Sequence, residues 1–359
     1  MRRLTASLAM AAIIIASPAA AAGLKIAVVA PAEGPFALLS KQITDGASFK
    51  AKDRGTEIIP IAETCEASGS ADLAKAIVDS GAEAAIGFLC TESLEAAMPV
   101  LAPANIPAIT LSVRSDILMG DAIKNNWPFF RLVPNAGAES TKITEAILAR
   151  WKNEPLALID DGTIHGRELV ESIKGALAEI GLTPLFADTY RPAQEQQVAL
   201  VRRLVKSGAT HVFVGGDRSD IAVIARDAKA ENGGLIFMGG EALNAADDPV
   251  PLEDGVLAIA LPDYARQPAA ADATAAFNQA GIVPEGYVLP GFSAVTLLEA
   301  AKDKAAAEDI PLRAAVARGS FETAIGTVSF GADHELKPTP YRLLEWRDDR
   351  FVEPAQQVN

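Results

Sequence analysis

The residues with the most evident chemistry follow short apolar runs. The run AAIGFL, residues 84–89, leads directly into Cys90, Thr91 and Glu92. A cysteine beside a hydroxyl group and an acid can be a catalytic thiol, half of a disulfide or the neighbour of a binding site. Thr91 also opens a segment of helical periodicity, where it can cap the helix or where an anion can bind the free N–H groups.

Two further polar residues, Ser112 and Arg114, come directly after the run PAITL at 107–111. The guanidinium of Arg114 can bind a ligand carboxylate through two parallel N–H bonds. It can equally form an ordinary surface pair with Asp116. The sequence leaves both interpretations open.

Paired glycines precede an acid twice in the second half of the chain, in GGD at 215–217 and in GGE at 239–241. Such glycines let the backbone approach a ligand, and the acids, Asp217 and Glu241, can accept a hydrogen bond from a cation or a hydroxyl. Asp217 can also serve as a helix N-cap. His165, in DGTIHGREL, lies in a predicted strand-to-helix loop, where it can line a site or face solvent.

Motifs that indicate catalysis are absent. The chain has no G-x-S-x-G elbow, no G-x-G-x-x-G, no Walker loop and no H-E-x-x-H. The acids that follow apolar runs are not spaced locally, and no EF-hand-like loop supports a divalent cation. We therefore predict a protein that is not an enzyme and that has neither a metal site nor a cofactor.

The first 22 residues have the three-part pattern of a secretory signal peptide. Arg2 and Arg3 precede an apolar stretch of about a dozen residues, and small residues end at Ala22. This stretch is too short for a membrane-spanning helix, and no later run reaches the roughly 18 apolar residues of a span. We expect cleavage after Ala22, export to the periplasm and a mature chain that is not embedded in a membrane.

Cys65 and Cys90 are the only cysteines of the chain. An even number of cysteines in an exported protein favours a disulfide, which here would close a loop of about 25 residues. Thiol catalysis would instead need a histidine as its base. None of the three histidines has a flanking motif that supports such a pair; they are His165, His211 and His334.

Composition limits the partners and the number of domains. The chain has 32 Lys and Arg against 46 Asp and Glu, a net charge of −14, which argues against nucleic acid as a partner. Half of its 359 residues are apolar, enough for two hydrophobic cores in a chain too long for one small domain.

Apolar runs alternate with segments of helical period, first up to residue 112 and again from residue 138. This alternation predicts parallel sheets with right-handed crossovers. The expected strands are 25–31, 57–64, 84–89 and 107–112, then 155–161, 183–190, 210–216, 235–240 and 255–262. The expected helices are 36–54, 70–81 and 91–102, then 138–152, 166–180, 195–206 and 218–230. Residues 118–136 break the pattern.

Helical segments dominate after residue 262, at 269–280, 290–307 and 311–318, before short strands at 327–330 and 341–346. We expect these late elements to return to the two lobes and not to form a third sheet. The predicted fold is α/β, with two doubly wound, Rossmann-like lobes joined by a multi-strand hinge. The predicted domains are a signal peptide (1–22), an N-terminal lobe (23–132 plus 264–338) and a C-terminal lobe (133–263 plus 339–359).

Several stretches, in this order, resemble the leucine/isoleucine/valine-binding family of type I periplasmic solute-binding proteins, which serve ABC transporters. They are KIAVVAPAEGP, the spacing of Cys65 and Cys90, FFRLVPNAGAES, the GG-acid turn at 215–217, FMGGE, and FETAIGTVSFGADHEL. Together they extend over residues 25–336. The resemblance implies two lobes that close around a small solute and present it to a membrane permease.

The resemblance also implies roles for individual residues. In amino-acid-binding members, the position of Thr91 holds the α-carboxylate, and the loop containing Ser112 and Arg114 contributes to the same group. The acid at the position of Glu241 takes the α-ammonium.

The chain departs from the family pattern at several of these positions. Asp217 and His165 stand where tyrosines are frequent, Leu39 where an aromatic often overlies the ligand, and Arg114 in place of a hydroxyl. The added charges of Arg114 and Asp217 suggest a ligand more polar than leucine, or a pair between the two residues across the cleft.

The expected function is the binding component of an ABC importer for an amino acid, of branched-chain type or more polar, or for a similar small carboxylate. The expected partners are this ligand and an ABC transporter permease, and the expected state is a monomer. A periplasmic sensor that reports to a membrane receptor or regulator is the alternative. The candidate ligand-binding residues are Thr91, Ser112, Arg114, His165, Asp217 and Glu241.

Overall fold

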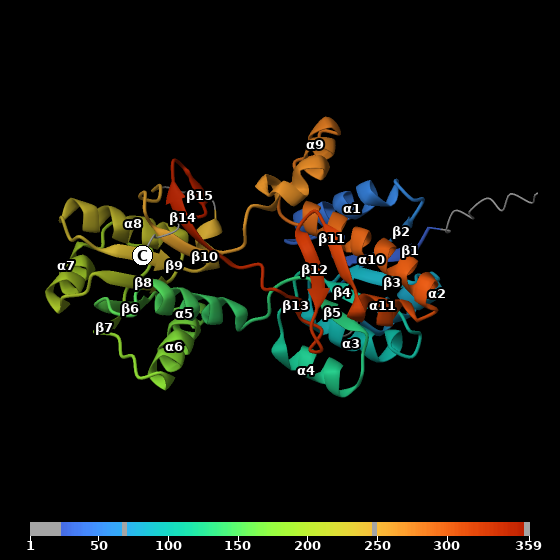
Figure 1. Cartoon of the computed structure of the whole chain (residues 1–359), viewed down its shortest axis with the longest axis horizontal. Coiled ribbons are helices and arrows are strands. Elements are labelled where there is room, and N and C mark those ends of the chain that lie inside the picture. Colours follow the sequence, from blue (N-terminus) through green and yellow to red (C-terminus); the bar gives the residue numbers. More distant parts are fainter. Residues whose placement is uncertain (1–22, 67–69, 246–249, 355–359) are drawn as a thin grey trace, which may run out of the picture.

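The computed structural model describes residues 23–66, 70–245 and 250–354. The predicted signal peptide lies outside the described residues. Figure 1 shows two lobes joined by extended segments of chain. Each lobe contains one large, mostly parallel sheet, so the predicted α/β fold of two doubly wound lobes is confirmed.

The sheet of the first lobe has five strands: β1 (Lys25–Ala30), β2 (Glu57–Ala62), β3 (Ala84–Gly87), β4 (Ala108–Thr110) and β5 (Phe129–Arg131). They are parallel and run in the order β2-β1-β3-β4-β5. Side chains of β1 alternate between two cores, with Ile26 and Val28 in one and Ala27 and Val29 in the other. Burial on both faces explains why these strands read as continuous apolar runs.

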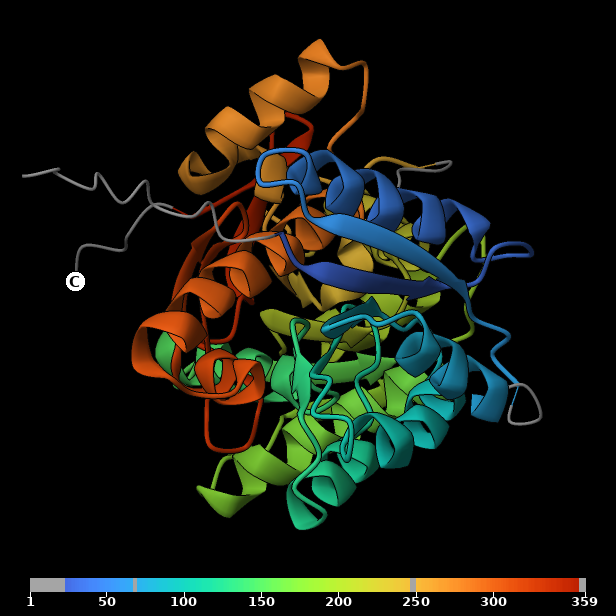
Figure 2. The same cartoon turned by 90° about the vertical axis from the view of Figure 1, so that its right-hand side faces the viewer.

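Helices cover both faces of this sheet, as Figure 2 shows from the end of the first lobe. The helices of the lobe's first half are α1 (Ala37–Ala51), α2 (Ser70–Asp79), α3 (Thr91–Leu101) and α4 (Asp116–Lys124). Helix α1 packs with α10 (Val288–Glu308) over one face, and α2, α3 and α4 cover the other. Gly46 permits the close approach of α1 to α10, because a Cβ there would collide with the carbonyl oxygen of Val288.

Strand β5 and most of helix α4 lie in the segment 118–136, which the sequence pattern left without elements. Phe129 and Phe130 of β5 are buried on opposite faces of the sheet. A strand of three residues is too short to display a period of two, so the pattern could not reveal it.

The second lobe repeats this architecture. Its strands are β6 (Leu156–Asp160), β7 (Phe186–Thr189), β8 (His211–Gly215), β9 (Ile236–Gly239), β10 (Leu257–Ala260), β14 (Arg342–Arg347) and β15 (Arg350–Val352). Their order is β15-β14-β10-β9-β8-β6-β7, antiparallel at β10-β14-β15 and parallel elsewhere. The helices are α5 (Ala138–Arg150), α6 (Ile164–Glu179), α7 (Val198–Ser207) and α8 (Arg218–Ala230), with a 3-10 turn, η2, at Glu241–Asn244.

The chain then returns to the first lobe through α9 (Ala271–Gln279), α10 and α11 (Leu312–Arg318). The expectation that no third sheet forms is wrong. Three short antiparallel strands, β11 (Ser320–Thr323), β12 (Gly326–Phe330) and β13 (Leu336–Lys337), make a small sheet of their own. This sheet is stable because Phe321, Val328 and Phe330 pack into the core of the first lobe beside α10 and α11.

Three segments cross between the lobes, after β5, after β10 and before β14. The first two leave from the carboxyl ends of their strands, and the third joins β14 beside the carboxyl end of β10, where Arg342 pairs with Ala260. The carboxyl edges of both sheets therefore face the opposite lobe. The crossings lie near the predicted domain boundaries, which themselves stay a prediction.

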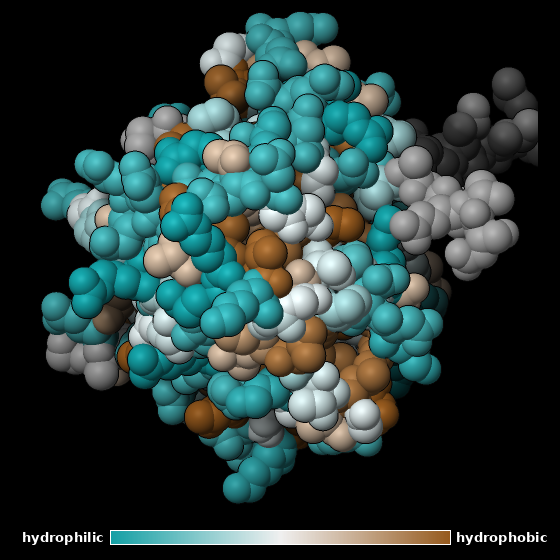
Figure 3. All heavy atoms as spheres, turned by 90° about the vertical axis from the view of Figure 1, so that its left-hand side faces the viewer, coloured by the Kyte–Doolittle hydropathy of each residue, from teal (hydrophilic) through white to brown (hydrophobic). Residues whose placement is uncertain are grey.

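The surface at the outer end of the second lobe is mainly hydrophilic, with smaller hydrophobic groups near its middle (Figure 3). Within residues 23–354, leaving aside the two short gaps, no helix combines the length and the apolar character needed to cross a membrane.

Arg131 fixes β5 to the small third sheet. Its side chain is fully buried, and its Nη1 lies 2.9 Å from Glu335 Oε1 and 3.4 Å from Asp116 Oδ1. Its Nη2 donates to the carbonyl oxygen of Ser115 at 2.5 Å. The guanidinium thus joins α4, β5 and the β12–β13 turn at the point where the chain leaves for the second lobe.

Glu63 fixes the loop that leads into α3. Its buried carboxylate accepts hydrogen bonds from the backbone N–H groups of Leu89, at 2.9 Å, and Cys90, at 3.1 Å. The predicted disulfide, Cys65–Cys90, lies beside it, with a Cα–Cα separation of 5.2 Å. Burial raises the pKa of Glu63 to about 7, although the two N–H groups oppose the shift.

We predict that Arg131→Met lowers the free energy of unfolding by about 3 kcal/mol, because it leaves Glu335 buried without its cation. Urea unfolding followed by circular dichroism measures the change. Replacing both residues by methionine should cost less than the single change, since no unpaired charge remains. A matched control is Arg54→Met, which removes an exposed pair with Asp303 and should cost much less. A double variant as unstable as the single one would contradict the prediction.

The raised pKa of Glu63 predicts how the free energy of unfolding depends on pH. The folded pKa lies above the unfolded value of 4.5, so the stability that Glu63 contributes is present below pH 4.5 and is lost as the pH rises to about 7. Wild type should therefore lose up to roughly 3 kcal/mol relative to Glu63→Gln between pH 4.5 and pH 8. Urea unfolding at both pH values tests this, with the exposed Glu57→Gln as control. Equal losses in wild type and Glu63→Gln would refute it.

Candidate ligand-binding site

Thr91 and Ser112 lie on neighbouring loops at the carboxyl edge of the first sheet. Thr110, the last residue of β4, ties these loops together: its hydroxyl donates to Phe88 O at 3.0 Å and accepts from the N–H groups of Ser112 and Val113 at 3.2 and 2.9 Å. Thr91 is the first residue of α3 and not its cap, since the N-cap position is Cys90.

The hydroxyl groups of Thr91 and Ser112 make no hydrogen bond with any residue that the structure describes, and both residues are half-buried. Helix α3 also has no side-chain cap at Cys90. Two hydroxyls and the N–H groups at the start of α3 are therefore available at this edge, an arrangement that suits an anionic group.

Arg114 of the first lobe forms an ion pair with Glu241 of the second. Its Nη1 donates to Glu241 Oε2 at 2.7 Å and its Nη2 to Glu241 Oε1 at 3.0 Å. Tyr341, which precedes β14, accepts from Arg114 Nη1 at 2.8 Å and donates to Glu241 Oε2 at 2.6 Å. The structure therefore pairs Arg114 with Glu241, and neither Asp116 nor Asp217 takes that place.

The electrostatics of this cluster keep both members of the pair charged. Burial alone would lower the pKa of Arg114, but the hydrogen bonds and charge of Glu241 outweigh it and raise that pKa. Burial likewise opposes ionisation of Glu241, yet the hydrogen bonds from Arg114 bring its pKa below the usual range. Burial and the nearby charge of Glu241 raise the pKa of Tyr341. Its hydroxyl therefore keeps its proton and donates it to Glu241.

Glu139 is a second buried acid beside the pair. Its Oε1 accepts from the backbone N–H of Glu241 at 2.7 Å. The room for this carboxylate comes from Gly240, where a Cβ would collide with Glu139 Oε1. Burial raises the pKa of Glu139, although the hydrogen bond from the backbone N–H of Glu241 opposes the shift. The glycine before Glu241 thus accommodates a protein carboxylate, a packing reason that the sequence pattern did not suggest.

A pocket of about 720 Å³ opens where Arg114, Glu139 and His165 meet. Its volume is within the range of small-molecule sites. His165 is exposed in the first turn of α6, whose cap is the Thr163 hydroxyl. The structure thus brings His165 to the same pocket as Arg114, which in turn binds Glu241.

Asp217 stands apart from this pocket. It is exposed at the N-cap position of α8, but its side chain makes no capping hydrogen bond. The glycines before it have packing roles, since a Cβ on Gly216 would collide with the hydroxyl of Tyr190 and one on Gly215 would crowd Gly166.

The other acids at strand ends stabilise their own loops. Asp160 accepts from the Gly162 N–H at 2.8 Å and the Thr189 hydroxyl at 3.0 Å, and Asp161 accepts from the N–H and hydroxyl of Thr163. Among the described residues, one group brings three potential metal-ligand atoms together: Glu63, Cys65 and Cys90. Both sulfurs of that group are in the disulfide and do not offer thiolates.

Sequence reasoning missed Glu139 and Tyr341. Glu139 lies in the NAGAES stretch after the first crossing, so an acid in the first turn of a helix at a crossing was the available signal. Tyr341 gave no local signal, because its contacts with Arg114 and Glu241 join parts of the chain far apart in sequence.

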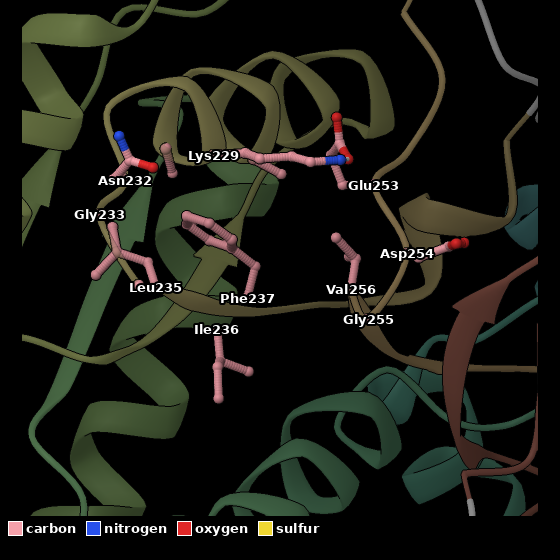
Figure 4. Close-up of a pocket in the computed structure, with 13 residues that line it drawn as sticks. Lys229, Asn232, Gly233, Leu235, Ile236, Phe237, Glu253, Asp254, Gly255 and Val256 are labelled. Atoms are coloured by element: carbon pink, nitrogen blue, oxygen red, sulfur yellow. Dashed lines mark hydrogen bonds and ion pairs between the residues drawn. The ribbon is translucent and has the colours of Figure 1, made fainter.

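A different hollow, of about 570 Å³, lies on the second lobe at the amino ends of β9 and β10 (Figure 4). Lys229 and Glu253 form an ion pair at its rim, and Phe237 and Val256 line it. None of the predicted ligand-binding residues lines it. Ligands of doubly wound sheets bind at the carboxyl ends of strands, so this hollow is not the candidate site.

Comparison with known proteins agrees with this fold. Leu/Ile/Val-binding protein homolog 3 of Brucella melitensis biotype 1 is 25% identical over 367 aligned residues, which cover 98% of each chain. The solved structure of a putative branched-chain amino acid ABC transporter from Rhodospirillum rubrum matches with a TM-score of 0.78 at 16% identity, over 92% of this chain and 100% of that one.

A solute-binding protein of an ABC transporter from R. palustris, solved in complex with benzoate, matches with a TM-score of 0.62 at 19% identity, over 92% of this chain and 95% of that one. At these identities the two structures show the fold alone. The proteins named here are transport or binding proteins, in agreement with the prediction that the chain is not an enzyme.

The family model described as periplasmic binding protein matches residues 23–350, nearly the whole of the described chain. Members of such a family work outside the cytoplasm, as the predicted leader also implies. The sheet order, the three crossings and this match lead to one conclusion: the chain belongs to the periplasmic binding protein family.

Proposed function

We propose that the protein is the periplasmic solute-binding component of an ABC importer, that it acts as a monomer, and that it captures an amino acid or a similar small carboxylate between its lobes. The observation that carries the proposal is the meeting of polar side chains from both lobes at the carboxyl edges of the sheets, next to a pocket of about 720 Å³. The relatives named for leucine, isoleucine and valine and the benzoate complex support a carboxylate-bearing solute.

The first lobe supplies the groups for an anion. The free hydroxyls of Thr91 and Ser112 and the start of α3 form one part, and Arg114 supplies the positive charge. The second lobe supplies Glu241, which binds Arg114, together with Asp217, which can accept hydrogen bonds, and His165 at the pocket wall. No single lobe contains both halves of this set.

Closure is then the step that gives specificity. A solute that satisfies the polar groups of both lobes stabilises the closed form, whereas one that leaves a buried group unpaired does not. The closed, loaded form is the one that a permease recognises, and the solute's class is the first property to establish.

A thermal-shift panel tests this proposal. Purified protein, stripped of solute by unfolding and refolding, is melted with amino acids, aliphatic and aromatic acids, amides and polyols. A carboxylate-bearing solute should raise the melting temperature, because a ligand that binds only the folded state stabilises it. Stabilisation by polyols or amides alone would contradict the proposed solute class.

Thr91→Ala should weaken binding of the stabilising solute by about tenfold, since it removes one hydrogen bond to a charged group. Titration calorimetry measures the dissociation constants of variant and wild type. Thr327→Ala is the matched control, because Thr327 is an exposed threonine on the β11–β12 hairpin, hydrogen-bonded to Glu322. Unchanged affinity in Thr91→Ala would remove the start of α3 from the site.

A further inference from the structure

We propose that the cleft selects small carboxylates that lack an α-ammonium group, and that Arg114 is the residue that receives the carboxylate. The inference rests on the proposed function and narrows its solute class. It starts from the ion pair between Arg114 and Glu241, which the sequence pattern did not anticipate.

Glu241 is already occupied by a cation of the protein. Its Oε2 accepts from Arg114 Nη1 and from the Tyr341 hydroxyl, and its Oε1 accepts from Arg114 Nη2. The side chains of Arg114 and Glu241 are 32% and 26% exposed, so the pair is largely shielded from water. A ligand ammonium at Glu241 would have to displace the guanidinium and leave its charge without a partner, which is strongly unfavourable.

Arg114 retains one free edge. A guanidinium has five N–H groups, arranged as two edges that can each bind a carboxylate. Nη1 is used by Glu241 and Tyr341, and Nη2 makes one bond to Glu241. Across the described residues, the Nε–H and the second Nη2–H have no protein acceptor. They lie on the same edge of the plane, which matches the spacing of the two oxygens of a carboxylate.

The charges of the site agree with an anion that brings no cation of its own. Arg114 and Glu241 cancel each other, and the Glu139 carboxylate already accepts a hydrogen bond from the backbone N–H of Glu241. His165 lines the same pocket and can donate a ring N–H to an anion. Glu168 and Glu171 also line the pocket, but both are exposed to solvent, which screens their charges.

Exposed apolar side chains lie near the carboxyl edges of both sheets, although none of them lines the pocket itself. Exposed apolar residues occupy the first turns that follow β1, β4 and β6, on the edges that face the opposite lobe: Leu38 is 63% exposed, Ile117 82% and Ile164 78%. Closure that covers such side chains is favoured by the hydrophobic effect. An aliphatic or aromatic body on the carboxylate is therefore compatible with closure of the lobes.

The test compares pairs of solutes that differ only in the α-ammonium group: leucine with 4-methylpentanoate, and phenylalanine with 3-phenylpropanoate. Calorimetry on solute-stripped protein should show that at least one des-amino acid binds about tenfold or more tightly than its amino partner, the effect of about one charged hydrogen bond. An amino acid that binds more tightly than its partner overturns the inference and leaves the proposed function standing.

Binding of none of the four solutes also overturns the inference, and the wider panel then decides the proposed function separately. The variant Glu139→Gln tests whether Glu139 binds a ligand ammonium in place of Glu241. If leucine binds the wild type and this variant abolishes that binding, Glu139 receives the ammonium and the inference is wrong.

Variants then test the role of Arg114 with the des-amino acid that binds. Arg114→Gln should weaken its binding by about 100-fold, and Arg114→Lys, which keeps the charge but not the second edge, by about tenfold or more. Glu241→Gln keeps an acceptor for Arg114 and should cost about tenfold or less. Arg202→Gln removes an arginine bound to Glu231 on the far surface of the second lobe and should change nothing.

Melting curves without solute confirm that each variant is folded before it is compared. A complete loss of binding in folded Glu241→Gln together with full binding in folded Arg114→Gln would reverse the assigned roles and overturn the inference.

Discussion

The direction in which the chain leaves its two sheets is the constraint on which the site depends. The first two crossings begin at the carboxyl ends of β5 and β10, and the third enters β14 beside the same edge of the second sheet. The carboxyl edges must therefore face each other, and every loop that follows a parallel strand points toward the cleft. Polar residues far apart in sequence, such as Arg114 and Glu241, come into contact for this reason.

The ion pair between Arg114 and Glu241 lies beside the crossings between the lobes. The carbonyl oxygen of Arg114 accepts from the N–H of Ala136 in the first crossing, at 3.2 Å, and Tyr341 belongs to the third. Points near a hinge move less than points far from it. In the proposed closure, the pair can therefore persist while Thr91 and the exposed Asp217, on opposite lobes, approach each other.

Much of the fold follows from the sequence because long apolar runs with turn residues between them leave little choice of element. Helix α8 has the predicted bounds, and the disulfide follows from an even cysteine count in an exported chain. The shortest strands could not be predicted, because β5 has three residues and β13 has two, too few to show a period in the sequence. The third sheet forms because its apolar side chains join a core that already exists.

The residues of the candidate site could likewise be predicted only in part. Thr91, Ser112, Arg114 and Glu241 stand at strand ends, where a local pattern can identify them, but partners across the lobes cannot be identified locally. Arg114 was a candidate to pair with Asp217, and the structure gives it Glu241 instead. Glu139 and Tyr341 complete that pair through contacts that only the tertiary fold creates.

A pair that forms within the protein also changes what a solute must contribute to closure. Taking Glu241 out of water is unfavourable, and the bonds from Arg114 and Tyr341 compensate for it before any solute arrives. In a site whose acid waits for a ligand ammonium, that compensation comes only on binding, and solutes without the ammonium are rejected. Here the acid is already satisfied, so an ammonium gains nothing from Glu241 and still loses its own hydration, whereas a carboxylate finds an unoccupied edge of Arg114. An arginine and a glutamate in a cleft thus favour a solute without an ammonium group when they bind each other, and a solute with one when the glutamate is left free.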